Sequence, residues 1–584
     1  MVFCVIFVPI DPNVLNAPNV SDVQNDHIQL NKISLLFHTL RHLRPVQIYG
    51  RIRFRIYKPR PDRGPATKKA PRQAKWIRPP LRHQSLIGPR AFDHLHCKYE
   101  LTGKGPWQVA DASRLWNYHL NYFDDLVSRG FEDRRKWHLD LIREWIEENP
   151  VGTEPAWEPY PISRRVVNWI KADLTEPILD KSALDSLALQ VRYLAGRCEH
   201  HLQGNHLWIN GKALVFAGLF FGGHRANGEA ARWLTDGFNI IRREFTEQVR
   251  SDGSHFEQSP MYHALMVEDA LDLINVGRAF GWTPFETWKP TVASMLEYLA
   301  AATHPDGEIA LFNDAALNVA LLPRELCDYA RRLGFGTSTE PKKGSGLQWF
   351  PDSGLVRIEK GPWTLLADTG PIGPDYIPGH AHADSLTFEL SVGDHRLIVD
   401  TGTGVYRPGP ERSYQRSTAA HNTVRVDGLD SSEVWDSFRV ARRAKPMGLA
   451  KISSTNGHVI CTAGHDGYAR LPGRLIHKRT FRVDGDTILI TDDLSGGGSH
   501  DLELRLHLHP DVCLEKTEED WQTIDSATGQ VQAGIRFEGI DEVRTESCSY
   551  SPEFGRFLPA VKLVARRRST LPCTMTTMIT RERH

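Results

Sequence analysis

The spacing of apolar residues changes once along this chain, near residue 346. Before that point, apolar residues recur at i, i+3, i+4 and i+7, the period of amphipathic helices. After it they alternate, and Gly-Asp or Asp-Gly pairs mark tight turns between strands. The helical segments are RLWNYHLNYFDDLVSRG, RRVVNWIKADL, LDSLALQVRYLAGRCEHHL, HALMVEDALDLINVGRAFGW and VASMLEYLAAAT, and the strand segments are DSLTFELSVGDHRLIVDTG, GRLIHKRTFRVDGDTILITDDL and LELRLHLHPDV. This order predicts a helical domain followed by an antiparallel β-sandwich.

The predicted fold class is therefore multi-domain α+β. The chain has 584 residues, of which 40% are hydrophobic and 24% charged, as in an ordinary globular protein of several domains. We expect a basic arm or extension over residues 1–95, a helical domain over 96–345 and the sandwich over 346–584. The short loops between helices fit a bundle, a solenoid or an α/α toroid.

The charge balance excludes a general attraction to polyanions, because 71 basic residues face 71 acidic ones. We therefore expect no nucleic-acid partner, and no apolar stretch is long enough to predict a membrane span. The exception is local: sixteen Lys and Arg but a single acid, Asp62, lie between Lys32 and Arg90. That segment is either a patch for an acidic polymer or anionic membrane, or an arm that wraps the next domain, and we favour the arm.

The cysteines and the start of the chain bear on the compartment. Eight cysteines lie far apart with no CxxC pair, which excludes zinc ribbons and predicts mostly buried thiols. The apolar start MVFCVIFVPIDP lacks a basic segment before it, so it is not a convincing signal peptide. Cytoplasm and periplasm both stay open.

Two motifs in the helical half carry polar and aromatic residues together. In WEPYPISRRVVNWI, Trp157 and Tyr160 could stack on sugar rings, and Arg164 or its neighbour could meet carboxylates or sulfates. The alternative is packing at a helix entry. In GNHLWINGKAL, Asn205 and His206 lie at a helix start, where Asn205 either donates to a substrate carboxylate or caps the helix.

A third motif, DGSHFEQSPMYHALM, places Tyr262 in the first turn of a helix. The positive end of the helix dipole favours a phenolate there, which suits a proton shuttle. The alternative is a tyrosine at the edge of the core.

The fourth motif, GHAHADSLTFEL, is followed by LIVDTG and AAHNTV. His380 and His382 would point to one face of a strand. Asp400 follows on the paired strand and His421 on a later one, so two His and one Asp from neighbouring strands could form a zinc site. The alternative is a hydrogen-bonded polar cluster.

Taken together and in this order, RLWNYHLNYFD, WEPYPISRRVVNWIK, GNHLWINGKAL, DGSHFEQSPMYH and GHAHADSLTFEL with DTGTGVY and STAAHNTV resemble the heparinase II/III-like polysaccharide lyases, which include the heparinases and some alginate lyases. The resemblance covers about residues 35 to 515. It implies an α/α toroid followed by an antiparallel β-sandwich, and eliminative cleavage of a uronate-containing polysaccharide.

The resemblance also implies roles for single residues. The residue that neutralises the carboxylate falls on Asn205 with His206 beside it, the catalytic tyrosine on Tyr262 and the histidine base on His380. Tyr406 and Arg416 resemble further residues of the cleft. A structural zinc would be held by His382, Asp400 and His421, with no organic cofactor.

Elimination requires a neutralised carboxylate, a base at C5 and an acid at the glycosidic oxygen. Two other functions stay open. One is a glycoside hydrolase on a toroid, with Glu257, Asp252 and Asp314 as carboxylates. The other is a polysaccharide-binding or assembly protein without catalysis. The identity of the polymer, endo or exo action, syn or anti elimination and the oligomeric state do not follow from the sequence.

Overall fold

The computed structural model describes residues 32–581 except 226, 337–345, 456 and 519. The apolar start of the chain and Cys4 lie outside the described residues. Within them, no helix is both long and apolar enough to cross a bilayer.

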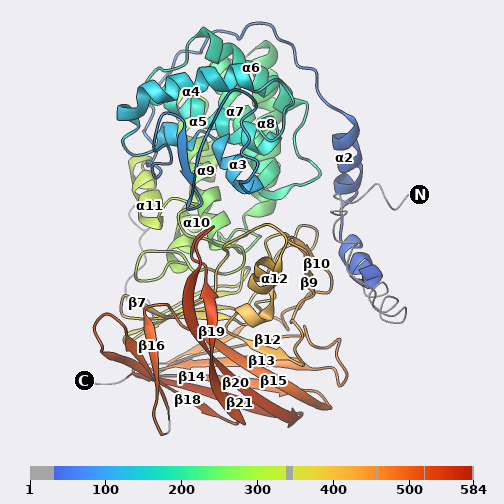
Figure 1. The fold of residues 1–584 in the computed structure, drawn as a ribbon, viewed down its shortest axis with the longest axis vertical. Coiled ribbons are helices and arrows are strands. Elements are labelled where there is room, and N and C mark those ends of the chain that lie inside the picture. The colour runs from blue at the N-terminus through green and yellow to red at the C-terminus, as the bar shows by residue number, and fades with distance from the viewer. Residues whose placement is uncertain (1–31, 226, 337–345, 456, 519, 582–584) are drawn as a thin grey trace. The chain divides into compact units, whose positions relative to one another are not determined.

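Helices dominate the first part of the described chain, as the 3.6-residue period predicts (Figure 1). Their bounds are α2 Pro45–Ile56, α3 Arg114–Leu120, α4 Arg135–Glu148, α5 Pro159–Thr175, α6 Lys181–Ala195, α7 Gly204–Gly222, α8 Gly228–Gln248, α9 Pro260–Ala279, α10 Lys289–Ala301, α11 Pro323–Arg332 and, later, α12 Pro410–Arg416. The predicted helix over 114–130 is shorter than expected and ends at Leu120. Phe123 there has φ 59°, which a continuous right-handed helix does not allow.

Strands follow in antiparallel sheets. Two short pairs, β1 Ala91–His94 with β2 Cys97–Glu100 and β9 Val434–Trp435 with β10 Arg439–Val440, lie apart from them. The five-stranded sheet has the order β3-β4-β5-β6-β7, with β3 Leu347–Phe350, β4 Leu355–Lys360, β5 Trp363–Asp368, β6 Phe388–Val392 and β7 His395–Ile398. The four-stranded sheet has the order β19-β20-β15-β8, with β19 Glu542–Tyr550, β20 Leu558–Thr570, β15 Ser499–His507 and β8 Val424–Val426.

The largest sheet has eight strands in the order β11-β12-β13-β14-β21-β18-β17-β16. These are β11 Lys451–Ser454, β12 Val459–His465, β13 Ile476–Val483, β14 Thr487–Ser495, β21 Cys573–Arg581, β18 Val531–Glu538, β17 Trp521–Asp525 and β16 Val512–Lys516. Figure 1 shows β13, β14 and β21 side by side in orange and red. Burial alternates residue by residue along β13 and β14, as the two-residue period predicts.

The described chain forms two compact units. Unit 1 comprises the residues up to Gln248, Asp269–Trp288 and Asp375–Ile377, and unit 2 comprises Val249–Glu268, Lys289–Pro374 and Pro378 onward. Residue 345 therefore separates helical from strand-rich sequence, but it does not separate the compact units. The reason is that α10 shares a core with β3, β4 and β5 through Tyr298, Phe350 and Leu366.

Unit 1 is held together by helices that are buried along most of their length. Nearly every side chain of α7 is buried, so this helix lies inside the unit rather than on its surface. Two glycines allow α7 and α8 to approach closely. A Cβ at Gly218 would lie 2.7 Å from the Leu234 backbone nitrogen, and one at Gly237 would lie 2.8 Å from the Val215 backbone nitrogen.

The basic arm packs on unit 1 rather than presenting all its charges to solvent. Lys69 pairs with Asp173 at 2.9 Å, and Arg72 donates to the Leu174 carbonyl at 2.9 Å. The Ala70 amide donates to the Phe220 carbonyl of α7 at 2.8 Å. These bonds use the arm to satisfy polar groups at helix ends.

Unit 2 has its main apolar core between the five-stranded and the eight-stranded sheets. Buried residues from β4 to β7 meet buried residues from β12, β13, β14, β18 and β21 in one cluster. The seven described cysteines are free, and only Cys327 and Cys461 are buried. The prediction of mostly buried thiols is therefore wrong, because residues such as Cys97 and Cys513 lie on exposed positions of β2 and β16.

One buried ion pair crosses β13 and β14. Both oxygens of Asp492 accept from the Arg479 guanidinium, at 2.7 and 2.9 Å, and His477 Nε2 lies 2.7 Å from the same carboxylate. Arg479 also donates to the Leu386 and Asn422 carbonyls. Burial alone would raise the pKa of Asp492, but Arg479 and His477 lower it to about 2.

We expect Asp492→Asn to lower the free energy of unfolding by about 3 kcal/mol, because it leaves the Arg479 charge buried without its partner. Urea unfolding at neutral pH measures this. Because the folded-state pKa is depressed, the stabilisation is present above the unfolded pKa and is lost as pH falls towards about 2. The variant should therefore lose less stability than the wild type between about pH 4 and 2.

The matched control is Asp493→Asn, one residue along the same strand. Asp493 pairs with Lys478 at 3.4 Å, and both side chains are well exposed. An exposed pair of this kind contributes at most about 1 kcal/mol. Equal losses in the two variants would contradict the importance of the buried pair.

Candidate active site

The Asp314 carboxylate joins three groups in unit 2. Arg412 contacts both its oxygens, with Nη2 2.8 Å from Oδ2. His380 Nδ1 lies 2.9 Å from Oδ2, and His382 Nε2 lies 2.9 Å from Oδ1. Asp314 is fully buried, which alone would raise its pKa, yet Arg412 and the two histidines hold that pKa well below its usual range. The carboxylate is therefore a fixed acceptor for both histidines.

The protonation of His380 follows from this contact. An ionised carboxylate only accepts hydrogen bonds, so Nδ1 of His380 must carry the proton and Nε2 has the lone pair. Nε2 lies 3.9 Å from Glu257 Oε2, and the side chain is 15% exposed. His380 thus presents a basic nitrogen at a partly accessible position, and its imidazolium form would lie between two carboxylates.

Tyr262 stands directly beside this histidine. It is the third residue of α9, whose start is fixed by Ser259: the Ser259 hydroxyl accepts from the Tyr262 amide and donates to the Asp314 carbonyl. The ring centroids of Tyr262 and His380 are 4.0 Å apart. The Tyr262 hydroxyl lies 3.0 Å from that of Tyr406. Unit 2 therefore brings together three of the predicted residues.

His380 and His382 do not lie on a strand, and that prediction is wrong. They occupy an irregular segment before β6. Side chains rather than a strand ladder hold this segment: the Asn313 amide oxygen accepts from the His382 amide, and Arg416 donates to the Ala381 carbonyl at 2.9 Å. Both histidines nevertheless reach one carboxylate.

Arg416 therefore supports the fold instead of facing a cleft. It is buried, and besides the Ala381 carbonyl it donates to those of Asp436 and Arg439. Burial, aided by the charge of Arg412, lowers the pKa of Arg416 to about 9. A guanidinium surrounded by backbone carbonyls orders the segment before β6 rather than facing a ligand.

In unit 1, Asn205 and His206 are the second and third residues of α7, at a helix start as expected. His206 Nδ1 lies 3.2 Å from Glu199 Oε1, and its ring centroid is 4.8 Å from that of Tyr160. The Glu199 amide and its other carboxylate oxygen bond to Asn210 on α7. Unit 1 thus brings His206, Glu199 and Tyr160 together, and Asn205 is next to His206 in the chain.

Trp157 and Arg164 are placed differently. Trp157 is 3% exposed, and its indole donates to the Asn149 carbonyl, so it packs in the core of unit 1. Arg164 pairs with Asp124 at 3.1 Å. The neighbouring Arg165 is fully buried and donates to Gln190 and to two carbonyls. Burial excludes Trp157 from ligand stacking in this structure.

The three residues expected to hold zinc all lie in unit 2, but only some of the distances between them are short. His421 Nδ1 lies 2.6 Å from Asp400 Oδ2, and the rings of His382 and His421 are 5.3 Å apart. His421 precedes β8 and is not on a strand. Nδ1 of His382 and Nε2 of His421 are buried without a hydrogen-bond partner among the described residues. Within that same part of the chain, no three His, Cys, Asp or Glu side chains form a ready metal site.

The carboxylates considered for a hydrolase are mostly engaged elsewhere. Asp314 is tied to Arg412 and the histidines, as described above. Asp252 accepts from the Ser254 and Asp352 amides, which makes it a turn residue. Glu257 remains, buried and near His380 Nε2. Paired catalytic carboxylates are therefore not favoured by this geometry.

The sequence did not single out Arg412 or Glu199 and assigned Asp314 another role. Arg412 lies 98 residues from Asp314, so no local spacing joins them. The only available signal was the position of Arg412 two residues after Pro410, at the start of a short helix.

We expect nitrogen-15 NMR of histidine-labelled protein to show His380 as the Nδ1–H tautomer at neutral to mildly alkaline pH, because Asp314 can only accept. The spectrum of His380→Gln identifies the signals. His500 serves as an internal reference, since both its nitrogens face acceptors, Asp427 Oδ2 at 2.7 Å and the Gly497 carbonyl at 3.1 Å. An Nε2–H tautomer at His380 would contradict the assigned lone pair.

The helical and the strand-rich halves of the chain match models of one protein family. Residues 128–333 match "Heparinase II/III N-terminus", and residues 342–577 match "Heparinase II/III-like, C-terminal". Together the two matches span most of the chain, in the order that the sequence predicts.

Two curated relatives are heparin-sulfate lyases. The one from Bacteroides stercoris is 23% identical over 457 residues, which are 69% of this chain and 65% of the relative. The one from Pedobacter heparinus is 24% identical and covers 55% of this chain and 53% of the relative. The chain thus spans less than two thirds of the length of either relative.

The fold is also similar to that of a solved structure. A crystal structure of heparinase III matches with a TM-score of 0.66 at 17% identity, over 83% of this chain and 80% of that one. This likeness confirms the predicted fold class, an α/α toroid followed by an antiparallel β-sandwich. The chain belongs to the heparinase II/III-like family.

Proposed function

We propose that this protein is a polysaccharide lyase that cleaves a uronate-containing polysaccharide by β-elimination. The observation that carries the proposal is the contact between Tyr262 and His380, whose Nδ1 is held by Asp314. The two curated relatives, both heparin-sulfate lyases, support the same class of activity.

Elimination begins at C5 of the uronate. Removing this proton puts a second negative charge beside the carboxylate, so the carboxylate must first be neutralised. The C4–O bond then breaks, a C4=C5 double bond forms, and the leaving oxygen takes up a proton. Hydrogen-bond donors that neutralise such a developing negative charge typically raise the reaction rate by ~10²–10³.

Tyr262 and His380 are suited to the two proton transfers. When the C5 proton and the leaving oxygen are syn, the Tyr262 phenolate can take the proton and return it to the oxygen. When they are anti, His380 Nε2 takes the proton and the Tyr262 hydroxyl protonates the leaving oxygen. The second route leaves an imidazolium, which Asp314 and Glu257 would stabilise.

We assign carboxylate neutralisation to Asn205 and His206. Asn205 is half-buried at the start of α7, where the helix dipole favours an anion. Glu199 orients His206 through Nδ1. Tyr160 is close to His206 and supplies an aromatic wall for a sugar ring.

The relatives also support a proposal for the substrate class. We propose a glycosaminoglycan of the heparin-sulfate type, because both curated relatives carry that activity in their names. Arg164 and Tyr406 are then candidate contacts beyond the reacting sugar, whereas Trp157 and Arg416 are excluded from direct contact by burial.

We also propose that His382, Asp400 and His421 hold a structural zinc ion. The buried, unpaired ring nitrogens of the two histidines support this, since such atoms are costly to leave unsatisfied. Burial lowers the pKa of His382 to about 3, which keeps its imidazole in the neutral, metal-binding form. When bound, zinc would supply a positive charge that fixes the segment bearing His380.

The lyase proposal is tested by the ultraviolet absorbance of the C4=C5 double bond, measured over a panel of heparan sulfate, heparin, hyaluronan and alginate. We expect the wild type to produce it on a heparin-type polymer and Tyr262→Phe to lower kcat by ~10²–10⁴, because the acid is lost.

Tyr414→Phe is the matched control, since the hydroxyl it removes bonds to His507 at 3.4 Å and to Lys562 rather than to Tyr262 or His380. Its kcat should match the wild type. New reducing ends without the absorbance would instead identify a hydrolase, and binding without any product would identify a binding protein.

The zinc proposal predicts that dipicolinate lowers the melting temperature at concentrations that leave the kcat of the folded enzyme unchanged, because the ion would order structure rather than react. His421→Ala should abolish this chelator effect. Loss of activity at an unchanged melting temperature would contradict a structural role.

A further inference from the structure

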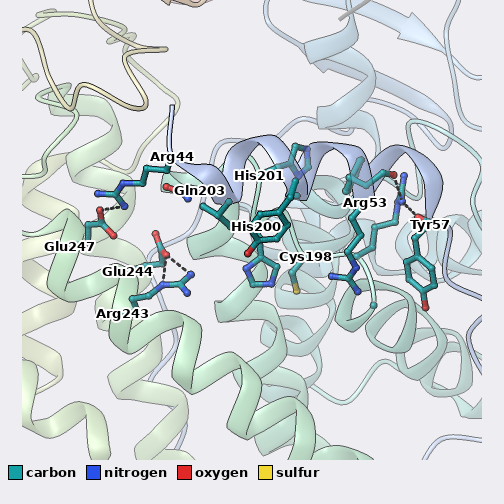
Figure 2. A pocket seen from close by; sticks show the side chains of 16 residues that line it. Arg44, Arg53, Tyr57, Cys198, His200, His201, Gln203, Arg243, Glu244 and Glu247 are labelled. Carbon is teal, nitrogen blue, oxygen red and sulfur yellow. Dashed lines mark hydrogen bonds and ion pairs between the residues drawn. The ribbon is translucent and has the colours of Figure 1, made fainter. Parts of the chain in front are cut away.

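A cavity of about 600 Å³ lies within unit 1, outside the residues assigned above. One wall is α2, the helix of the basic arm. The opposite walls are residues 196–203, which lead into α7, and the end of α8. Figure 2 shows the charged and aromatic side chains that line it.

Positive charge predominates in the lining. Four arginines line the cavity and only two acids do, Glu244 and Glu247. Glu247 pairs with Arg44 at 2.5 Å, and Glu244 pairs with Arg243 at 2.9 Å. These pairs leave the charges of the other two arginines uncompensated within the cavity.

The two remaining arginines differ in their hydrogen bonding. Arg197 donates to the Phe54 and Tyr57 carbonyls and stacks on the Phe54 ring at 3.8 Å, so it anchors α2. Arg53 lies over the Tyr57 ring at 5.4 Å, and its guanidinium has no ion pair or hydrogen bond in the part of the chain that the structure describes. All five of its N–H donors are available to a ligand.

A histidine lies between two of these cations. In Figure 2 the His200 ring stands between Arg243 and Arg53. Burial lowers the pKa of His200, and the charges of Arg243 and Arg53 lower it further. Arg53 and Arg243 thus face one cavity, and no acid is paired with Arg53, so the cavity can attract an anion. The lowered pKa keeps His200 neutral, so it can offer an N–H donor but no charge.

The volume and the lining of the cavity favour a saccharide over a small inorganic ion. Its volume falls in the range of sites for drug-sized ligands. Tyr49 and Tyr57 line it and offer faces for a sugar ring. Gln203 also lines it and immediately precedes α7, whose second residue is Asn205. A chain bound at Asn205 could therefore continue past Gln203 into the cavity.

We propose that this cavity is a subsite for a sulfate- or carboxylate-bearing sugar of the polysaccharide, contacted by Arg53 and Arg243. The inference rests on the proposed function, because it treats the ligand as a further part of the same acidic chain. Arg53 and Arg243 are then specificity-determining residues and take no part in the proton transfers.

The test measures binding of a heparan sulfate decasaccharide by calorimetry, in the Tyr262→Phe background so that the probe is not cleaved. We expect Arg53→Gln to raise Kd ~10-fold, because a charge-assisted contact is lost. The slope of log Kd against log salt should fall by about one, as expected for one ion contact to a polyanion. A merely structural role would not change that slope.

Arg55→Gln is the matched control. Arg55 lies two residues along the same helix, is exposed and does not line the cavity. We expect its Kd and salt slope to match those of the background protein. Arg243→Gln should raise Kd less than Arg53→Gln, because Glu244 already compensates the Arg243 charge. Melting temperatures of all variants check that they fold.

The outcomes separate this inference from the lyase proposal. If the wild type forms the unsaturated product but Arg53→Gln and Arg55→Gln bind alike, the subsite is wrong and the lyase stands. If no product forms but binding depends on Arg53, the subsite stands and the lyase fails. If neither product nor binding is seen, both fail. Inorganic sulfate competing as strongly, per anion, as the decasaccharide would reduce the subsite to a simple anion site and overturn the saccharide assignment.

Discussion

The candidate active site in unit 2 depends on one carboxylate. Asp314 accepts from His380 and His382 and is neutralised by Arg412, while its backbone carbonyl accepts from Ser259 at the start of α9. A buried acid of this kind is stable only as an ion with all its partners. The same contacts that satisfy it also fix the tautomer of His380 and the helix turn that carries Tyr262. The contacts that stabilise this part of unit 2 are therefore the same ones that position the groups of the proposed reaction.

Long-range polar contacts, rather than regular structure, position the reactive groups. His380 and His382 lie in an irregular segment that Asn313 and Arg416 hold by side-chain bonds. In this irregular segment both imidazoles reach the same carboxylate. A strand would only place them on the same face of the sheet, without giving them a common hydrogen-bond partner. A second buried arginine of unit 2 acts in the same way, since Arg479 on β13 donates to the Leu386 and Asn422 carbonyls.

The sequence predicted what depends on short spacing. The helical and strand periods, the position of Asn205 at a helix start and that of Tyr262 in a first turn all follow from neighbours a few residues apart. The strand expected at His380 does not form, because tertiary hydrogen bonds override the local pattern. Likewise the burial of Trp157 and the role of Asp314 depend on residues far away in the chain, which no spacing reveals.

The basic arm contributes contacts that unit 1 needs in order to fold stably. Its Ala70 amide satisfies a carbonyl of α7, and Lys69 neutralises Asp173 of α5. A shortened chain that starts at residue 128, where the family match begins, would leave these groups without their partners. The part of the chain that stabilises unit 1 is thus longer than the part that the family match covers. Substitutions in the basic arm would therefore change the stability of helices more than a hundred residues away in the chain.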